Sequence, residues 1–223
     1  MAAGTSTAAN AERSWFITQR WQAYDAESRA NLLRICAIGL FYLVHLWSYF
    51  SSQGKLPNFG VLQLAEAGSI GRQFHVAMTM LAVTWALFAL AVLILLQQKF
   101  FPRWLPYVST TFDIVLLTCV VCLGDAARSP LIVGYFLILI LAALRLSLPL
   151  IWFATVTSAL GYLCVLGVAK WPNAFGIAKL VGADHTEGRV PRYHEMIVML
   201  AVLFAGMLLG QIIRRVRRMA TGQ

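Results

Sequence analysis

The sequence predicts an all-α, polytopic integral membrane protein with about six transmembrane helices and both termini in the cytoplasm. Of its 223 residues, 60% are hydrophobic and 12% are charged, whereas a soluble domain normally carries about 25% charged residues. The apolar residues form long blocks, and the charges gather between these blocks. This pattern is typical of a chain that is surrounded by lipid for most of its length.

Six apolar blocks are the candidate transmembrane spans. Each block is close to the roughly 20 residues that cross the hydrocarbon core of a bilayer, and together they form a predicted domain over residues 32-213. The blocks are 32–52, 74–97, 105–123, 131–148, 149–169 and 194–213. The fourth and fifth blocks are separated only around Arg145, Ser147 and Pro149, which predicts a tight cytoplasmic turn.

Polar segments flank this domain at both ends. Residues 1-31 form a predicted cytoplasmic tail, in which 11–31 mixes aromatic with charged residues. Such a mixture favours an amphipathic segment in the membrane interface that runs into the first span. Residues 214-223 form a basic cytoplasmic tail.

The distribution of Lys and Arg predicts which side the termini face. With both termini inside, eleven basic residues lie on the inner side and seven on the outer side, and cytoplasmic loops of membrane proteins are rich in Lys and Arg. The inner set is Arg13, Arg20, Arg29, Arg34, Lys99, Arg103, Arg145, Arg214, Arg215, Arg217 and Arg218. We therefore expect a multi-pass protein of the cell inner membrane.

The net charge of +9 does not indicate nucleic-acid binding, because the basic residues lie at the ends of apolar blocks instead of on one soluble face. Nor does the chain carry a catalytic motif. It has no phosphate-binding glycine loop and no Gly-x-Ser-x-Gly or His-Glu-x-x-His sequence. We expect a protein that is not an enzyme and whose surroundings are the lipid bilayer.

Two regions of the sequence resemble each other, which indicates an internal repeat. KLPNFGVLQL … GRQFHVAMTMLAV runs from Lys55 to Val83, and KWPNAFGIAKL … GRVPRYHEMIVMLAV runs from Lys170 to Val202. Each is an outer loop followed by a span that enters from outside. Parallel repeats of this kind are found in membrane proteins, although similarity between biased sequences is the alternative explanation.

Asp113 is the candidate intramembrane polar site. It lies in the middle of the third span, where a carboxylate must face the helix bundle and find a partner. The candidate partners are His45 in the first span, Thr110 or Thr111, and Arg145 at the inner end of the fourth span. Such a group is either a proton or ligand site, or a residue that fixes helix packing through hydrogen bonds.

His75 and His194 occupy matching places in the two repeats, each at the outer start of a span. Two facing imidazoles could ligate haem b axially, and together with Glu195, His185 and Asp184 they could instead bind a transition metal. The alternative is that both are ordinary interfacial residues with an apolar body and a polar tip. No cofactor is firmly predicted.

The stretch from Phe74 to Leu163 resembles the multi-span input region of bacterial signalling receptors, which precedes kinase or nucleotide cyclase domains. The resemblance rests on Asp113, on the outer turn Gly124-Asp125 … Arg128-Ser129-Pro130-Leu131, and on Leu144-Arg145. The charged exit Arg214-Arg215-Val216-Arg217-Arg218 resembles the start of a linker helix to an output domain. This chain ends at Gln223 without such a domain, which implies a shortened form or a stand-alone relative that acts through a partner.

The resemblance implies a membrane-embedded sensor or anchor module that transmits a signal to the cytoplasm, as a homo-oligomer or with a signalling partner that meets the exit arginines. Two alternatives stay open. One is a haem-binding redox protein that uses His75 and His194, and the other is a small transporter centred on Asp113.

Overall fold

The structure is a computed structural model in which all the described secondary-structure elements are helical. It describes residues 3–55, 57, 72–98, 101–124, 129–171 and 192–221, without the side chains of 3–20, 22, 23, 192, 220 and 221. The helices are α1 (Ala3–Ser52), α2 (Arg72–Gln97), α3 (Leu105–Leu123), α4 (Val133–Leu144), α5 (Leu148–Lys170) and α6 (Arg192–Thr221), with a 3-10 turn, η3 (Pro130–Ile132), before α4.

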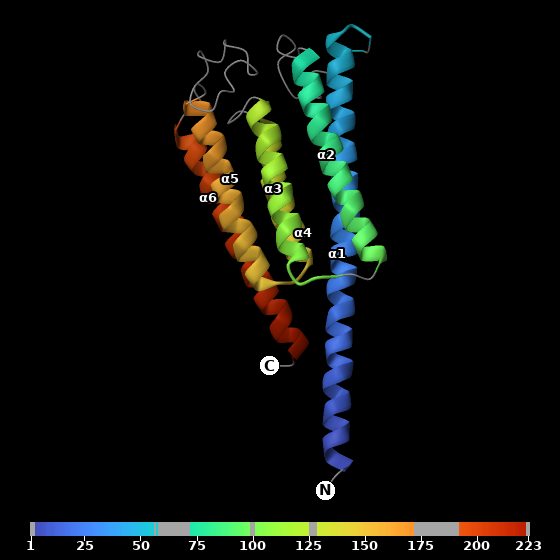
Figure 1. The fold of residues 1–223 in the computed structure, drawn as a ribbon. Helices are drawn as coiled ribbons and strands as arrows, with labels where there is room; N and C mark the ends of the chain where they lie inside the picture. The colour runs from blue at the N-terminus through green and yellow to red at the C-terminus, as the bar shows by residue number, and fades with distance from the viewer. Residues whose placement is uncertain are drawn as a thin grey trace.

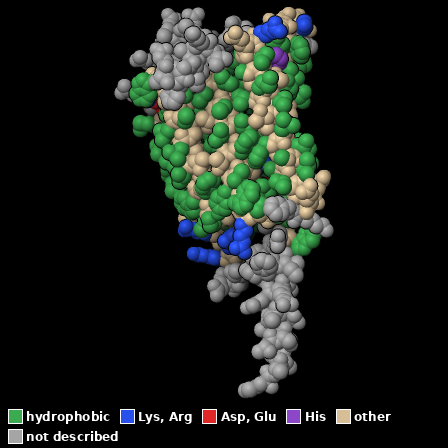
Figure 2. Space-filling view, viewed as in Figure 1, with side chains coloured by type: hydrophobic (Ala, Val, Ile, Leu, Met, Phe, Trp, Pro, Cys, Tyr) green, Lys and Arg blue, Asp and Glu red, His purple; other side chains and the backbone are tan. Residues whose placement is uncertain are grey.

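Five of these helices are long and apolar enough to cross a membrane, which confirms the prediction of an all-helical chain built from apolar spans. These are Tyr24–Ser52, Arg72–Gln97, Leu105–Leu123, Leu148–Lys170 and Tyr193–Met219, while Pro130–Leu144 is apolar but shorter. Figure 2 shows hydrophobic side chains covering the face of the bundle in view, with Lys and Arg gathered at its two ends. This surface suits contact with lipid acyl chains.

Proline marks the starts of three elements, because a proline in the first helical turn loses no intrahelical hydrogen bond. Pro106, Pro130 and Pro149 stand in the first positions of α3, η3 and α5. Helix α4 ends at Leu144, so the predicted block 131–148 is too long at its C-terminal end. A turn follows in which Leu146 has a positive φ of 49°.

Helices α3 to α6 form one packed group and α1 with α2 form a hairpin beside it (Figure 1). In the group, α5 packs against α6, α3 and α4, whereas α1 packs mainly against α2. The N-terminal part of α1 and the C-terminal part of α6 extend beyond the bundle at the same end, so both termini lie on one side.

Helix α1 corrects the predicted boundary between an interfacial segment and the first span. No proline interrupts it, and one helix runs from Ala3 to Ser52. Three residues that lie before or at the start of the predicted span are buried inside the bundle: Glu27, Asn31 and Arg34. The first span therefore enters the bundle near Tyr24.

Candidate functional site

A row of polar side chains on α1 faces the bundle interior. Glu27, Asn31 and Arg34 follow each other at spacings of four and three residues, which places them on one face of a helix. Their exposed fractions are 0%, 1% and 2%. Charges buried this deeply must be paired, and Glu27 and Arg34 both pair with residues outside α1.

Arg34 is paired with Asp113 of α3. The Arg34 Nε donates to Asp113 Oδ1 at 2.8 Å and to Oδ2 at 3.0 Å, and the Asp113 side chain is 4% exposed. Trp85 of α2 donates from its indole Nε1 to Asp113 Oδ1 at 2.9 Å. One carboxylate therefore holds α1, α2 and α3 together.

Asn31 extends this cluster toward α2. Its amide oxygen accepts a hydrogen bond from Arg34 Nη1 at 2.6 Å, and its amide nitrogen donates to the backbone oxygen of Ala89 at 3.0 Å. The Arg34 guanidinium also lies 5.9 Å from the centre of the Phe88 ring, within reach of a cation–π contact.

A second buried ion pair joins α1 to the end of α4. Arg145 Nε lies 2.6 Å from Glu27 Oε2, and Arg145 Nη2 donates to Glu27 Oε1 at 2.8 Å. The same guanidinium donates to Ser109 Oγ at 2.8 Å and to Thr110 Oγ1 at 2.7 Å on α3. Arg145 thus connects α1, α3 and the C-terminal end of α4.

The turn that carries Arg145 also touches α6. Arg217 donates from Nε and Nη2 to the backbone oxygen of Leu146, at 3.1 Å and 2.7 Å. Neighbouring residues of one turn therefore contact α1 through a side chain and α6 through a carbonyl.

His45 and His75 form a stacked pair between α1 and α2 near the other end of the bundle. His45 Nε2 lies 3.1 Å from His75 Nδ1, the ring planes differ by 16°, and Tyr49 stacks on His75 with ring centroids 3.8 Å apart. One imidazole donates and the other accepts, so both rings can be neutral.

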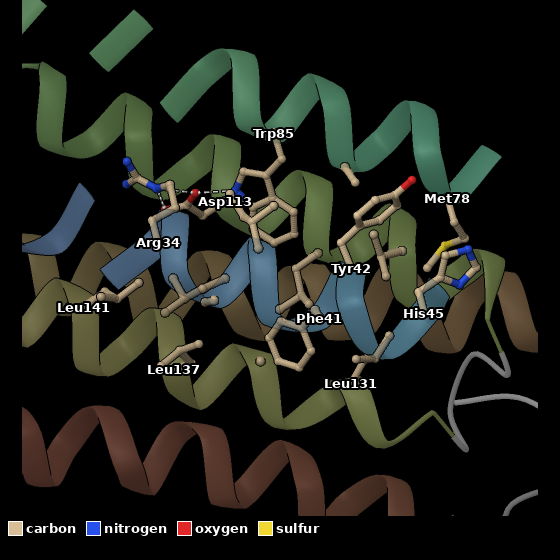
Figure 3. A pocket seen from close by; sticks show the side chains of 17 residues that line it. Arg34, Phe41, Tyr42, His45, Met78, Trp85, Asp113, Leu131, Leu137 and Leu141 are labelled. Carbon is tan, nitrogen blue, oxygen red and sulfur yellow. Dashed lines mark hydrogen bonds and ion pairs between the residues drawn. The ribbon is translucent and has the colours of Figure 1, made fainter. Parts of the chain in front are cut away.

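A cavity of about 80 Å³ lies between α1, α2, α3 and α4. Figure 3 shows Arg34, Asp113 and Trp85 at one end of it and His45 and Met78 at the other. Its walls are apolar almost throughout, because the charged groups of Arg34 and Asp113 are turned toward each other.

The sequence-predicted residues are brought together in combinations that differ from the expected ones. Asp113 faces the interior, but its partners are Arg34 and Trp85 in place of His45, Thr110, Thr111 or Arg145. Arg145 pairs with Glu27, and His45 pairs with His75. Arg34, counted among the charges that set topology, is instead a buried ion-pair partner.

His75 and His194 are not brought together. His75 lies on α2 beside His45, whereas His194 is exposed at the start of α6, and Figure 1 places α2 and α6 on opposite sides of the bundle. Glu195 pairs with Lys170 at 3.0 Å. His185, Asp184 and most of both repeat loops lie outside the described residues, in which no group of three or more His, Cys, Asp or Glu side chains could hold a metal ion.

Sequence reasoning missed Glu27 and Asn31 because they precede the first apolar block. The signal was present, since Glu27, Asn31 and Arg34 share one helical face that continues in phase to His45. A polar stripe in register with a transmembrane face indicates that the helix enters the bundle earlier than hydropathy alone suggests.

Comparisons with protein-family models, with curated proteins and with solved structures give no match to this chain.

Proposed function

We propose that this protein is a sensor and anchor module that crosses the cell inner membrane six times, with both termini in the cytoplasm, and passes a signal to a cytoplasmic partner through the ends of α1 and α6. The observation that carries this proposal is the turn after α4, where Arg145 pairs with Glu27 of α1 and Leu146 accepts hydrogen bonds from Arg217 of α6.

The ion pairs give α1 a preferred position against the rest of the bundle. Breaking one partner of a buried ion pair costs about 3–5 kcal/mol, so α1 cannot slide gradually past Arg145 and Asp113. Such contacts favour discrete positions of the helix, which is what a switching element needs. Because α1 continues without interruption to Ala3, a shift inside the bundle is carried to its cytoplasmic end.

The basic end of α6 supports the proposed orientation and partner site. Arg214, Arg215, Arg217 and Arg218 are exposed, and basic residues beside a transmembrane helix are typical of the cytoplasmic side. A partner with an acidic surface would meet these residues at the end of the molecule where α1 also projects.

The first test measures whether the Glu27–Arg145 pair sets the distance between α1 and α6. Spin labels are placed at Trp21→Cys and Met219→Cys, two exposed positions outside the bundle core, after Cys36, Cys119, Cys122 and Cys164 are changed to serine. In the reconstituted protein, Glu27→Gln should shift the interlabel distance by about 1–5 Å, the range of helix shifts and one-turn steps.

Lys170→Gln is the matched control, because it breaks the partly exposed pair with Glu195 on α5 and α6 and should leave the distance unchanged. A Glu27→Gln distance equal to that of the unsubstituted protein would contradict the proposed coupling.

A further inference from the structure

We infer that the cavity between α1, α2, α3 and α4 binds a single hydrocarbon chain, from an acyl or isoprenoid amphiphile, that enters from the side of Phe41, Tyr42 and Met78. The inference follows from the shape, lining and closure of the cavity. A role of the bound hydrocarbon as the signal rests on the proposed function, whereas its binding in the cavity does not.

The cavity is long and narrow. It follows α1 from Arg34 to His45, and eleven residues of α helix cover about 16 Å. Its volume of about 80 Å³ is about five to eight times what one water molecule needs on the same measure. These dimensions suit a stretch of extended chain and are too small for a cofactor with a large ring system such as haem.

The lining selects an uncharged occupant. Ile38, Leu117, Leu137 and Leu141 contribute aliphatic walls. The Arg34 and Asp113 charges at the closed end are paired with each other, although the buried Arg34 Nη2 has no hydrogen-bond partner among the described residues. A carboxylate or phosphate inside the cavity would meet a guanidinium whose charge is already paired with Asp113, and it would lose its hydration. A methylene chain has no charge whose hydration would be lost on entering the cavity.

The entrance lies toward the His45 end. Arg34, Asp113 and Leu141 are 2%, 3% and 6% exposed, so the opposite end is closed. Phe41 is 38% exposed and Tyr42 and Met78 are partly exposed. Figure 3 shows these three side chains in the half of the cavity nearer His45. The Tyr42 hydroxyl and the His45 imidazole can hydrogen-bond a small polar head group there.

The position of α1 would respond to such an occupant. The chain would lie between α1 and the helices α3 and α4, and the same stretch of α1 carries Arg34 at its closed end. A longer chain therefore reaches the Arg34–Asp113 pair, while a shorter one stops before it.

The test is photo-crosslinking of the protein reconstituted in lipid nanodiscs. Two probes carry a diazirine near the end of a twelve-carbon chain: an uncharged fatty alcohol, and a phosphatidylcholine with the same chain in one position. We expect mass spectrometry to map crosslinks to Ala37, Leu137 and Leu141. Labelling by the alcohol identifies a free amphiphile as the source, and labelling by the phospholipid identifies a bilayer lipid. A diazirine placed next to the head group should instead label Tyr42 and Met78.

A pair of variants makes the test specific. Ala82→Leu places a larger side chain on the cavity wall. One extra or missing methylene group in an apolar pocket changes affinity by about tenfold or more. We therefore expect labelling of Leu137 and Leu141 to fall by about tenfold or more. Ala86→Leu, on the exposed face of the same helix, should retain it.

Leu137→Ala widens the cavity and should raise the labelling of Ala37 and Leu141. This variant keeps the test decisive if Ala82→Leu folds poorly. Crosslinks found only on outward-facing residues such as Leu87 and Leu163, or lost equally in Ala82→Leu and Ala86→Leu, would overturn the inference. If the cavity is labelled but the spin-label distance is unchanged in Glu27→Gln, hydrocarbon binding stands and the sensor proposal fails. If the distance shifts but the cavity is not labelled, the sensor proposal stands and hydrocarbon binding fails.

Discussion

The contact between α5 and α6 and the contact between α1 and the bundle are built in different ways. Gly206 of α6 lies so close to Thr155 of α5 that an added Cβ would collide with its side chain. Gly161 of α5 similarly meets Thr118 of α3, where an added Cβ would lie 2.8 Å from the hydroxyl oxygen. Small residues allow helices to approach closely in an apolar solvent.

Helix α1 has the opposite kind of contact. It is held by two ion pairs and by the Asn31 amide, and a cavity separates part of it from α3 and α4. Close packing distributes attraction over many atoms, whereas ion pairs concentrate it at a few points. The difference teaches that α3 to α6 form a fixed scaffold and that α1 is attached to it at defined places.

The largest expected effect on stability comes from removing the α3 carboxylate that pairs with α1. Asp113→Ala leaves Arg34, which is 2% exposed, without its carboxylate partner, and should lower the free energy of unfolding by about 3–5 kcal/mol. Unfolding in mixed detergent and SDS micelles measures this. The double variant Arg34→Leu with Asp113→Leu should lie closer to the unsubstituted protein, because no unpaired charge remains. A double variant less stable than Asp113→Ala would contradict the ion-pair account of α1.

A smaller effect is expected from disturbing the close packing of the scaffold. Gly206→Val inserts a branched side chain against Thr155 and should cost about 1–3 kcal/mol in the same unfolding measurement. Gly39→Val is the matched control, because nothing lies within 4 Å of a Cβ at Gly39. Equal losses in the two variants would show that helix propensity, and not the α5–α6 contact, sets the effect.

The smallest effect should come from an uncharged hydrogen bond inside the scaffold. Tyr135→Phe removes the 2.8 Å contact between the Tyr135 and Thr118 hydroxyls, and such bonds between transmembrane helices average about 0.6 kcal/mol. Thr118 keeps its bond to the backbone oxygen of Ile114. Tyr162→Phe should cost less still, because the buried Tyr162 hydroxyl has no hydrogen-bond partner among the described residues. Reversal of this order would count against hydrogen bonding as the cause.

The helices could be predicted from the sequence because apolar length and proline placement act locally. The start of α5 at Leu148, next to Pro149, follows from such a signal. The end of α4 was predicted too late, because the apolar residues continue past Arg145 and hydropathy averages over a single charge.

The pairing of the buried charges could not be predicted from the sequence, because it depends on how helices rotate and slide against each other. The sequence offered four candidate partners for Asp113, and Arg34 was not among them. Arg34 and Asp113 are 79 residues apart, and only the packing of α1 beside α3 brings them together. His75 likewise pairs with His45 through the α1–α2 hairpin, whereas the repeat pointed to His194.

The short fourth helix has a consequence for the bilayer itself. With η3, α4 supplies twelve α-helical and three 3-10 residues, or about 24 Å of apolar length, against a hydrocarbon core of roughly 30 Å. Arg145 cannot reach outward to relieve this hydrophobic mismatch, because Glu27 holds it inward. In the proposed six-span arrangement, a thick bilayer would have to thin beside α4 or pull on the turn that follows it. Membrane thickness would thus become a mechanical load on a turn that contacts both α1 and α6.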